Sequence, residues 1–584
     1  MRRTGLLLLS VVAAAPLGAQ PADDPLAPLS PDGDRDVSVP QTDTKAGAIQ
    51  PPKLPTVPVV VPHDWAGVLR EIDIGDWEGA RQGIAGLPDD PLRPYALAEL
   101  YVAKGSPKVS QQALVDLIAA APELPQAAQL AKMAAGRGDA IVPTYAYPRP
   151  MLNLGVAPRR TKTRPAVGDP TADLLRGQLD PFVKADDGPG AEAMMLEAMT
   201  TIAVPEARAE LLQRVAWIYY VAGRDDDARR LGEQGRAENS GEWAGQSAWI
   251  SGLASWRLGD CASAFNAFSD AARLMRDWEL QAGAYFWAAR SAQACRRPSL
   301  VRGLLQSAAR SNETFYGILA RETLGMDHRM ARPLPPRDLA RLEMLPNIRR
   351  AQSLLAMGRR AAAEELIRHQ AKIGNPSDHA GLIRVAEKMS LPGAQFWLAH
   401  FGPAGARVDP ADRYPIPAWV PYNGWRVDPA LAYAHIIQES NFRTEAVSAA
   451  GAVGLMQVRP GTAGDTARSR GLSFSASSLK DPLANIDYGQ AFIELIRNAA
   501  ATKGQLPKVI AAYNAGPLPV ARWTINDRGD PLLWMESIPY WETRYYVPTV
   551  MRNMWVIQGL KGEPIPTLTA LAQHKWPAFP TVRR

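Results

Sequence analysis

A single glutamate near the end of a predicted apolar helix is the first candidate for acid–base chemistry. Asp428 and Pro429 are a favourable N-cap and first helical residue, and the pattern AYAHIIQES that follows predicts a helix. Glu439 lies on the same face of this helix as His435, in a stripe that is otherwise apolar. Burial of a carboxylate among apolar groups raises its pKa, as a general acid near neutral pH requires. The alternative interpretation is an ordinary surface glutamate near a helix C-terminus.

The glycine-rich stretch at 446–463 carries groups suited to binding a sugar. Gly451, Gly454 and Gly461 punctuate this stretch, and glycine allows a backbone to approach a ligand closely. Gln457 lies between two of these glycines and offers both a hydrogen-bond donor and an acceptor. Such a side chain suits sugar hydroxyls or an acetamido group.

Two later motifs add aromatic and polar groups. The segment AAYNAGP at 511–517 places Tyr513 and Asn514 before a glycine turn, and IPYWETRYYVPTV at 538–550 surrounds Glu542 with aromatic rings. Aromatic faces beside hydrogen-bonding groups suit sugar rings. Core packing is the alternative role for several of these rings.

The elements that must position these residues are helical. From about Asp64 the chain is rich in alanine and leucine, and short predicted helices alternate with glycine turns. The same pattern, a helix end followed by a glycine turn and a new helix, recurs at 73–84, 101–114, 220–231, 256–268 and 355–366. Gly223 and Gly259 lie 36 residues apart, which is close to the period of tetratricopeptide-like helix pairs. We therefore predict an all-α fold with an α-solenoid over residues 64–375, interrupted by a long Pro- and Arg-rich loop at 141–175.

Composition also suggests domain boundaries after the solenoid. A Pro- and Gly-rich stretch at 401–425 predicts a boundary. We predict a linker region over 376–414, a compact domain over 415–560 and a loosely attached C-terminal tail at 561–584.

The N-terminus is typical of an exported protein. Two arginines, a short apolar run and small residues predict a signal peptide at 1–19, and the Pro-rich segment at 20–63 predicts a disordered tether. The apolar run is about half of the roughly 20 residues that span a bilayer, so we expect a periplasmic protein that does not span a membrane. Cys261 and Cys295 could form one disulfide or remain two buried thiols.

The overall composition is that of a globular protein, with 46% hydrophobic and 21% charged residues. The net charge of +6 is mild for 584 residues, and no basic cluster stands out, so we expect no nucleic-acid partner. We also expect neither a metal site nor a cofactor.

Taken together, the motifs resemble the soluble lytic transglycosylase family, whose catalytic domain is lysozyme-like. The resemblance rests on four motifs in the family's order, ES-x-F at 439–442, AVSAAGAVGLMQVRPGTA at 446–463, AAYNAGP at 511–517 and ETRYYV at 542–547. A weaker match, FYGILARETLG at 315–325, resembles a sequence motif in the helical superhelix of the large soluble members. The resemblance implies a mainly α, lysozyme-like catalytic domain that follows a helical superhelix.

The resemblance also implies roles for individual residues. Glu439 matches the family's sole catalytic carboxylate, and Ser440 is its usual neighbour. The other positions implied to bind substrate are Gly454, Met456, Gln457, Tyr513, Asn514 and Glu542. Asn485 and Gly489 match a further family motif whose role is mostly structural. Leu518, Pro519 and Tyr540 differ from the residues usual in the family at these positions.

The implied substrate is the glycan strand of peptidoglycan. Protonated Glu439 would donate to the glycosidic oxygen between N-acetylmuramic acid and N-acetylglucosamine. As a carboxylate, it would then take the proton of the same muramic acid's 6-hydroxyl, which leaves a 1,6-anhydromuramic end. Because that attack is intramolecular, no positioned water and no second carboxylate are needed.

Two other functions stay open at this stage. A hydrolytic muramidase would need a second acidic group, for which Glu445 and Asp465 are the nearest by sequence. A non-catalytic scaffold would hold glycan while its solenoid binds proteins of cell-wall synthesis or division. The sequence does not decide between exo and endo cleavage.

Overall fold

The computed structural model describes residues 61–139, 141–331, 338–469, 471, 473–580 and 582. The predicted signal peptide at 1–19 and most of the tether predicted at 20–63 lie outside the described residues. Nearly all regular secondary structure of the described chain is helical, with one short antiparallel pair of strands, so the all-α prediction is confirmed. Within these ranges, no helix combines the length and apolar character needed to cross a bilayer.

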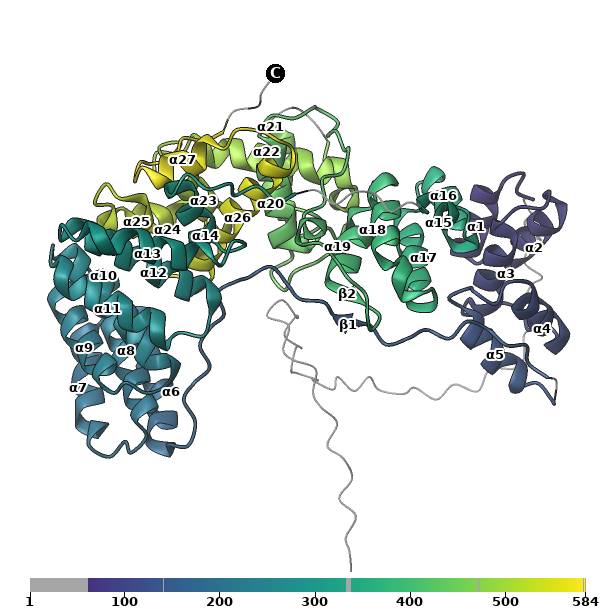
Figure 1. Ribbon diagram of the computed structural model, residues 1–584. Helices are drawn as coiled ribbons and strands as arrows, with labels where there is room; N and C mark the ends of the chain where they lie inside the picture. Colours follow the sequence, from purple (N-terminus) through teal and green to yellow (C-terminus); the bar gives the residue numbers. More distant parts are fainter. Residues whose placement is uncertain are drawn as a thin grey trace, which may run out of the picture.

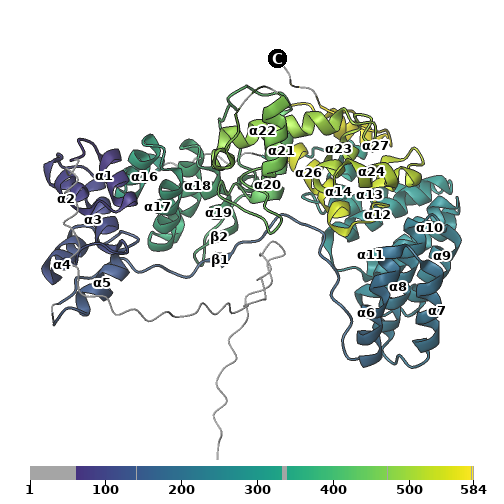
Figure 2. The same cartoon turned by 180° about the vertical axis from the view of Figure 1, so that it is seen from behind.

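The helices form an arch with a helical body at each end and the C-terminal helices at the top between them (Figure 1). The view from behind shows the same order (Figure 2). We call the two ends the first and the second helical body, and we call α20–α27 the C-terminal domain.

The first helical body is built from two segments that are far apart in the sequence. Its helices are α1 (Trp65–Ile74), α2 (Trp77–Gly86), α3 (Leu92–Val102), α4 (Gln111–Ala120), α5 (Ala127–Ala135), α15 (Leu339–Glu343), α16 (Pro346–Ala356), α17 (Arg360–Ile373), α18 (His379–Lys388) and α19 (Pro392–His400), with a 3-10 turn η1 (Pro376–Asp378). Their apolar faces share one core. Arg350 of α16 ties the segments together, because it donates to Glu123 Oε1 at 2.5 Å and to the Pro91 carbonyl at 2.9 Å.

An extended segment crosses from the first body to the second beneath the arch (Figure 1). Its strand β1 (Leu152–Asn153) pairs with β2 (Phe401–Gly402), which directly follows α19. Farther along, Arg160 is buried and forms a two-pronged ion pair with Glu536, at 2.8 and 2.5 Å. The loop predicted at 141–175 is therefore a strap with specific contacts, and it ends where α6 begins.

The second helical body is a run of consecutive hairpins. Its helices are α6 (Pro170–Ala185), α7 (Gly188–Met199), α8 (Pro205–Val221), α9 (Asp225–Ala237), α10 (Gly241–Arg257), α11 (Cys261–Leu274), α12 (Trp278–Ala294), α13 (Pro298–Ala309) and α14 (Phe315–Thr323). Gly223 and Gly259 end α8 and α10 at φ +76° and +77°, the left-handed region that favours glycine. Cys261 and Cys295 form a disulfide, so the bridged alternative is the one observed.

The C-terminal domain shares its core with the second helical body. Its elements are α20 (Pro429–Ser440), α21 (Pro460–Ser469), α22 (Pro482–Arg497), α23 (Leu506–Ala515), α24 (Pro517–Arg522), α25 (Pro531–Met535), α26 (Trp541–Leu560) and α27 (Pro566–Ala572), with 3-10 turns η3 (Ala476–Lys480) and η4 (Trp523–Asn526). The 3-10 turn η2 (Pro410–Arg413) precedes the domain and contacts α19. One buried cluster runs through both parts. Phe315 of α14 stacks on Trp555 of α26 with ring centroids 5.0 Å apart, and the Tyr316 hydroxyl donates to Glu536 at 2.7 Å.

Three predicted boundaries need correction. The helices predicted as one solenoid over 64–375 are divided between two cores, because an amphipathic pattern shows that a helix has a buried face and not which partner covers it. The predicted linker at 376–414 contains α18 and α19, which belong to the first core. The tail predicted at 561–584 contains α27, whose Leu568 and Leu571 are fully buried.

Candidate active site

Helix α20 positions Glu439 as the sequence predicts. The Asp428 side chain accepts a hydrogen bond from the Ala430 N–H at 2.8 Å, and Pro429 is the first helical residue. The helix ends at Ser440, and Asn441 follows in the left-handed conformation at φ +51°. Glu439 therefore lies in the last turn, half-buried at the lip of a cleft.

This cleft has a volume of about 560 Å³ and joins four separate parts of the C-terminal domain. It brings together five of the predicted site residues, Glu439, Gln457, Tyr513, Asn514 and Glu542. They come from α20, the glycine-rich stretch, α23 and the first turn of α26. The tertiary structure thus assembles residues that span a hundred positions of the chain into one concave surface.

The surroundings of Glu439 favour its protonated form. The pKa of this carboxyl is raised to about 7, mainly by burial and in part by the nearby Glu542, whereas the hydrogen bond from Tyr546 opposes the rise. The Tyr546 hydroxyl donates to Glu439 Oε1 at 2.5 Å. A carboxyl with such a pKa can both donate and take up a proton near neutral pH.

Behind Tyr546 lies His435, one helical turn before Glu439. His435 Nδ1 is 2.7 Å from the Tyr546 hydroxyl. The imidazole is buried, its pKa is lowered to about 3 by that burial, and its ring packs 4.4 Å from the Tyr513 ring. His435 is therefore neutral at physiological pH, and only one of its two nitrogens carries a proton.

The two hydrogen bonds of Tyr546 can serve both protonation states of Glu439. With the proton on His435 Nδ1, the imidazole donates to Tyr546, which donates to the Glu439 carboxylate. With the proton on Nε2, Tyr546 donates to His435 and accepts from protonated Glu439. Within the described residues His435 Nε2 has no hydrogen-bond partner, so neither tautomer is excluded.

Glu542 and Asn514 form the opposite wall. Asn514 Nδ2 donates to Glu542 Oε1 at 3.0 Å, and the Thr543 hydroxyl donates to Asn514 Oδ1 at 2.6 Å. Both ends of the Asn514 amide are thus engaged. The Tyr513 hydroxyl donates to the Met456 carbonyl at 2.7 Å, which anchors α23 to the glycine-rich stretch.

Comparison with known proteins decides the family. The Transglycosylase SLT domain family matches residues 421–531. The chain is 31% identical over 159 residues to the endo-type membrane-bound lytic murein transglycosylase A of Klebsiella pneumoniae (strain 342), and the match covers 24% of this chain and 78% of that protein. This chain belongs to the lytic murein transglycosylase family.

The larger relatives match over a smaller share of their length. The soluble lytic murein transglycosylase of Escherichia coli (strain K12) is 35% identical over 133 residues, which is 22% of this chain and 20% of that protein. The matched region thus spans about a fifth of the length of these soluble relatives, and it lies in the transglycosylase domain.

Solved structures of lytic transglycosylases share the fold over most of the chain. An inactive glutamate-to-glutamine variant of the lytic transglycosylase Slt from Pseudomonas aeruginosa aligns with a TM-score of 0.51, at 20% identity, over 85% of this chain and 86% of that one. The 70-kDa soluble lytic transglycosylase in complex with bulgecin A aligns with a TM-score of 0.55, at 18% identity, over 88% of this chain and 98% of that one. The predicted fold class, a helical superhelix followed by a lysozyme-like domain, is confirmed.

Three predicted substrate-binding residues of this transglycosylase domain do not line the cleft. Ser440 is buried and its hydroxyl donates to the Ile436 carbonyl at 3.2 Å, while Met456 is fully buried. Gly454 has φ +78°, and a Cβ there would lie 2.2 Å from the Leu479 carbonyl oxygen. The substrate-contact prediction for these three is corrected, because the residues shape the cleft wall without reaching its surface.

Asn485 holds that wall in place, in keeping with the structural role implied for it. This buried side chain accepts from the Met456 N–H at 2.7 Å and donates to the carbonyls of Val453 and Leu479 at 2.9 and 2.8 Å. Gln457, at φ +48°, is thereby presented to the cleft.

The nitrogen of the Gln457 side-chain amide is already engaged in hydrogen bonds within the protein. Its Nε2 donates to the Gly454 carbonyl at 2.9 Å and to the Ala446 carbonyl at 3.2 Å. Its amide oxygen is then the end left to face the cleft, and it can accept a hydrogen bond from an acetamido N–H or a hydroxyl.

The acids considered for a hydrolase lie elsewhere. Asp465 is exposed and pairs with Arg468, and Glu445 lines a different depression. Glu542 is the second carboxylate of the cleft. In the ranges that the structure describes, no group of three or more His, Cys, Asp or Glu residues is arranged to hold a metal ion.

The sequence-based interpretation missed Tyr546. It treated the aromatic residues around Glu542 as core or sugar-stacking groups, whereas Tyr546 bonds directly to the candidate acid. The available signal was its position four residues after Glu542, on the same helical face.

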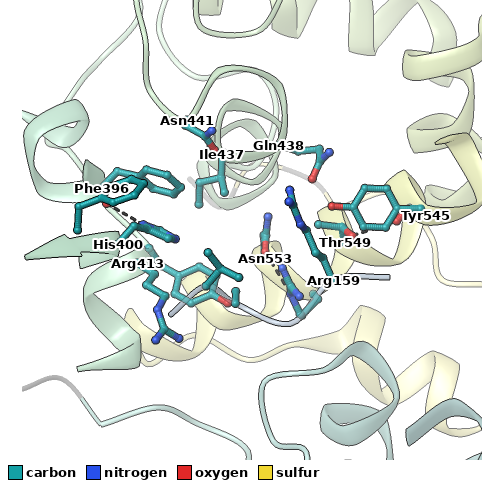
Figure 3. Close-up of a pocket in the computed structure, with 15 residues that line it drawn as sticks. Arg159, Phe396, His400, Arg413, Ile437, Gln438, Asn441, Tyr545, Thr549 and Asn553 are labelled. Carbon is teal, nitrogen blue, oxygen red and sulfur yellow. Dashed lines mark hydrogen bonds between the residues drawn. The ribbon is translucent and has the colours of Figure 1, made fainter. Parts of the chain in front are cut away.

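A second cavity, of about 230 Å³, lies beside the same helix end (Figure 3). Gln438 of α20 and Asn441, which follows this helix, line it, and Tyr545, Thr549 and Asn553 face it from α26. The strap and the end of α19 close the remaining sides. The last turn of α20 is thus bounded by two cavities, and Glu439 faces the larger one.

Proposed function

We propose that this chain cleaves the β-1,4 bond between N-acetylmuramic acid and N-acetylglucosamine in peptidoglycan without water, and that Glu439 acts first as acid and then as base. The product is a 1,6-anhydromuramic end. The observation that carries this proposal is the environment of Glu439, whose pKa is raised to about 7 and whose Oε1 is held by Tyr546. A general acid is most effective when its pKa lies near the working pH.

The first step is protonation of the leaving oxygen. When the Tyr546 hydroxyl donates to Oε1 of Glu439, Oε2 is the oxygen left to carry the proton toward the glycosidic bond. The acetamido oxygen of the muramic acid stabilises the cationic centre from within the substrate. The amide oxygen of Gln457 supports this group by accepting its N–H.

The second step uses the same carboxylate as a base. Glu439 takes the proton of the 6-hydroxyl on the same sugar, and that oxygen attacks the anomeric carbon. The attack is intramolecular, so it gains the high effective concentration that a bound water would otherwise have to supply.

A hydrolytic muramidase is the second candidate, and Glu542 is the observation that favours it. This carboxylate lies in the cleft with Glu439, where it could orient a water. Its Oε1 already accepts from Asn514, which suits a positioning role better. Digestion of sacculi in ¹⁸O-water separates the two: we expect unlabelled anhydro ends by mass spectrometry, and labelled reducing ends as the main product would establish hydrolysis.

The substitution Glu439→Gln tests the acid–base role. Glutamine preserves the shape of the side chain but cannot exchange a proton, so we expect turnover to fall by at least about 10²–10⁴-fold while glycan binding persists. The matched control is Glu445→Gln, an acid outside the cleft. Residual activity within tenfold of wild type would remove Glu439 from the mechanism.

The cellular setting follows from the substrate. We propose a periplasmic enzyme whose helical bodies hold the glycan strand or meet proteins of cell-wall synthesis and division.

A further inference from the structure

The cavity in Figure 3 lies where three parts of the chain meet. The strap lines it with Val156, Ala157 and Arg159, the first helical body with the end of α19, and the C-terminal domain with α20 and α26. We call it the junction cavity. The sets of described residues that line this cavity and the active-site cleft do not overlap, so the two are separate sites.

The ionised side chains that line the junction cavity are all cations, namely Arg159, Arg413 and Arg552. Arg413 Nη1 donates to Glu313 Oε2 at 2.8 Å, which compensates its charge. Arg552 Nη1 likewise donates to Glu279 Oε1 at 3.2 Å. The side chain of Arg159 is exposed and takes part in no hydrogen bond or ion pair with any described residue. The cavity therefore carries one uncompensated positive charge, which the strap supplies.

Three residues in the wall carry buried polar atoms without a hydrogen-bond partner among the described residues. These atoms are the Tyr414 hydroxyl, Asn553 Nδ2 and Arg413 Nε. Tyr414 and Asn553 are only 2% and 1% exposed. Burial raises the pKa of Tyr414, so its hydroxyl keeps its proton at neutral pH. Because native proteins leave few buried polar groups unpaired, three of them around one cavity favour a ligand that accepts hydrogen bonds.

Asn553 faces the junction cavity from α26, and its neighbour in the chain orients its amide (Figure 3). Its Oδ1 accepts from Nε and Nη2 of Arg552 at 3.3 and 2.9 Å, so Nδ2 is the end that remains, and it can only donate. His400 also lines the cavity but adds no charge, because burial lowers its pKa and its Nδ1 lies 2.7 Å from the Phe396 carbonyl oxygen. The polar part of the cavity thus offers mainly hydrogen-bond donors and one positive charge.

The junction cavity also has an apolar side, formed by Val156, Phe396, Phe401 and Ile437. Its volume is about 230 Å³. Sites for drug-sized ligands are larger, at roughly 300–1,000 Å³. The walls therefore suit a small ligand with one apolar part and one part that accepts hydrogen bonds.

We propose that the junction cavity binds a small organic carboxylate. The carboxylate group would accept hydrogen bonds from Arg159, Asn553 and Tyr414. The apolar part of the ligand would pack on Phe396 and Ile437. Charge-assisted hydrogen bonds from a guanidinium to a carboxylate are stronger than those between neutral groups. A neutral ligand would not use the charge of Arg159, and an inorganic anion would not use the apolar wall.

Such a ligand would connect the first helical body with the C-terminal domain. It would contact α19 on one side and α20 and α26 on the other. Because a ligand that binds only the folded state stabilises that state, saturation should raise the unfolding temperature of both parts. Ile437 and Gln438 directly precede Glu439, so the ligand would also rest against the helical turn that carries the candidate acid.

The first experiment identifies the class of ligand by isothermal titration calorimetry of the full chain. Its probes are phenylacetate, the neutral analogue phenylacetamide and inorganic phosphate. We expect saturable binding of one phenylacetate per chain. Binding of the other two should be at least about tenfold weaker, since one lacks the charge and the other lacks the apolar part. The proposal is overturned if phenylacetate binding does not saturate, or if either of the other probes binds as tightly.

The second experiment compares two buried tyrosines. The Tyr433 hydroxyl donates to the Pro417 carbonyl at 2.7 Å, whereas the Tyr414 hydroxyl has no partner in the part of the chain that the structure describes. Tyr414→Phe should weaken phenylacetate binding about fivefold, as suits the loss of one neutral hydrogen bond, and leave Tm at or above that of wild type. The control Tyr433→Phe should lower Tm and leave phenylacetate binding unchanged. A lower Tm for Tyr414→Phe would show that its hydroxyl is already paired in the free protein, and it would overturn the proposal.

The third experiment removes the charge of Arg159, which is exposed, so the substitution does not disturb the core. Arg159→Gln should weaken phenylacetate binding about tenfold, as suits the loss of one charge-assisted contact. The control is Arg302→Gln, because Arg302 is exposed on α13 and does not line the cavity. Equal binding by wild type and Arg159→Gln would overturn the proposal.

Turnover assays then separate the junction cavity from the cleft. Because the two sites share no lining residue among those described, phenylacetate should leave the KM for glycan strands unchanged. Competitive inhibition would place the probe in the cleft and overturn the separate site. Calorimetry needs no cleavage, so it reports on the cavity whichever way the proposed function is decided.

Discussion

The two helical bodies look alike in sequence but differ in what completes their cores. The first body closes its core by itself, with α1–α5 packed against α15–α19. The second body, α6–α14, continues into the C-terminal domain through one buried cluster. Charged groups reinforce that junction, because Arg160, Glu536 and Tyr316 are all buried in one hydrogen-bonded group. We infer from this difference that the C-terminal domain and the second body fold as one unit, the catalytic unit, and that the first body folds as a separate unit.

The largest expected effect comes from separating the C-terminal domain from the second body. A fragment of residues 408–584 would expose the surface that Phe315 and its neighbours cover, so we expect it to be insoluble or unfolded. Coexpression with residues 141–331 should restore a soluble complex. A soluble, active fragment on its own would contradict the shared core, and size-exclusion chromatography with circular dichroism distinguishes these outcomes.

A matched pair of core substitutions tests the same division at single residues. Phe315→Ala removes the ring that stacks on Trp555, and Leu354→Ala opens the first core. We expect losses of about 3–5 kcal/mol and about 2–5 kcal/mol in the unfolding free energy.

The two substitutions should lower the stability of different unfolding transitions. In calorimetry, Leu354→Ala should lower only a transition of the first body and leave turnover close to wild type. Phe315→Ala should lower the transition of the catalytic unit together with activity. Loss of activity to the same degree in both variants would mean that the two bodies unfold as one.

A smaller effect is expected at the hydrogen bond between Tyr546 and Glu439. This bond lowers the pKa of Glu439, so Tyr546→Phe should raise that pKa and move the alkaline fall of activity to higher pH. A net hydrogen bond of about 1 kcal/mol corresponds to a shift of about 0.5–1 pH unit.

The control for this measurement is Tyr545→Phe, because Tyr545 lines the neighbouring cavity instead. Its pH–rate profile should match wild type. An unchanged profile in Tyr546→Phe, or a shift toward lower pH, would contradict the assignment.

Ionisation of Glu439 should also affect stability, and this effect should be confined to the catalytic unit. The pKa of Glu439 is raised from 4.5 to about 7 by burial, so the folded state holds its proton more tightly than the unfolded state. The resulting stabilisation is complete below pH 4.5 and is lost as the pH rises through 7.

The side chain introduced by Glu439→Gln does not ionise, so the variant does not lose this stabilisation as the pH rises. We expect Glu439→Gln to exceed wild type by about 3 kcal/mol in unfolding free energy at pH 8 and to equal it at pH 4. The transition of the first body should be the same in both proteins at either pH. Denaturant titrations at the two pH values make the comparison, and equal stabilities at pH 8 would refute the raised pKa.

The sequence by itself determined the local features of this protein. The cap at Asp428 and the proline after it set the start of α20, and the periodicity placed Glu439 on its otherwise apolar face. The left-handed turns after α8 and α10 follow from glycine alone. These features depend on neighbours within a few residues, whose chemistry can be read directly from their order.

Only the tertiary structure decided which distant groups meet. The contact of His435 with Tyr546, the union of Cys261 with Cys295 and the packing of α27 all join residues from different helices. The assignment of α18 and α19 to the first core is of the same kind. An apolar stripe is equally compatible with many partners, so the pattern reveals that a face is buried while the choice of partner depends on how all the helices fit together.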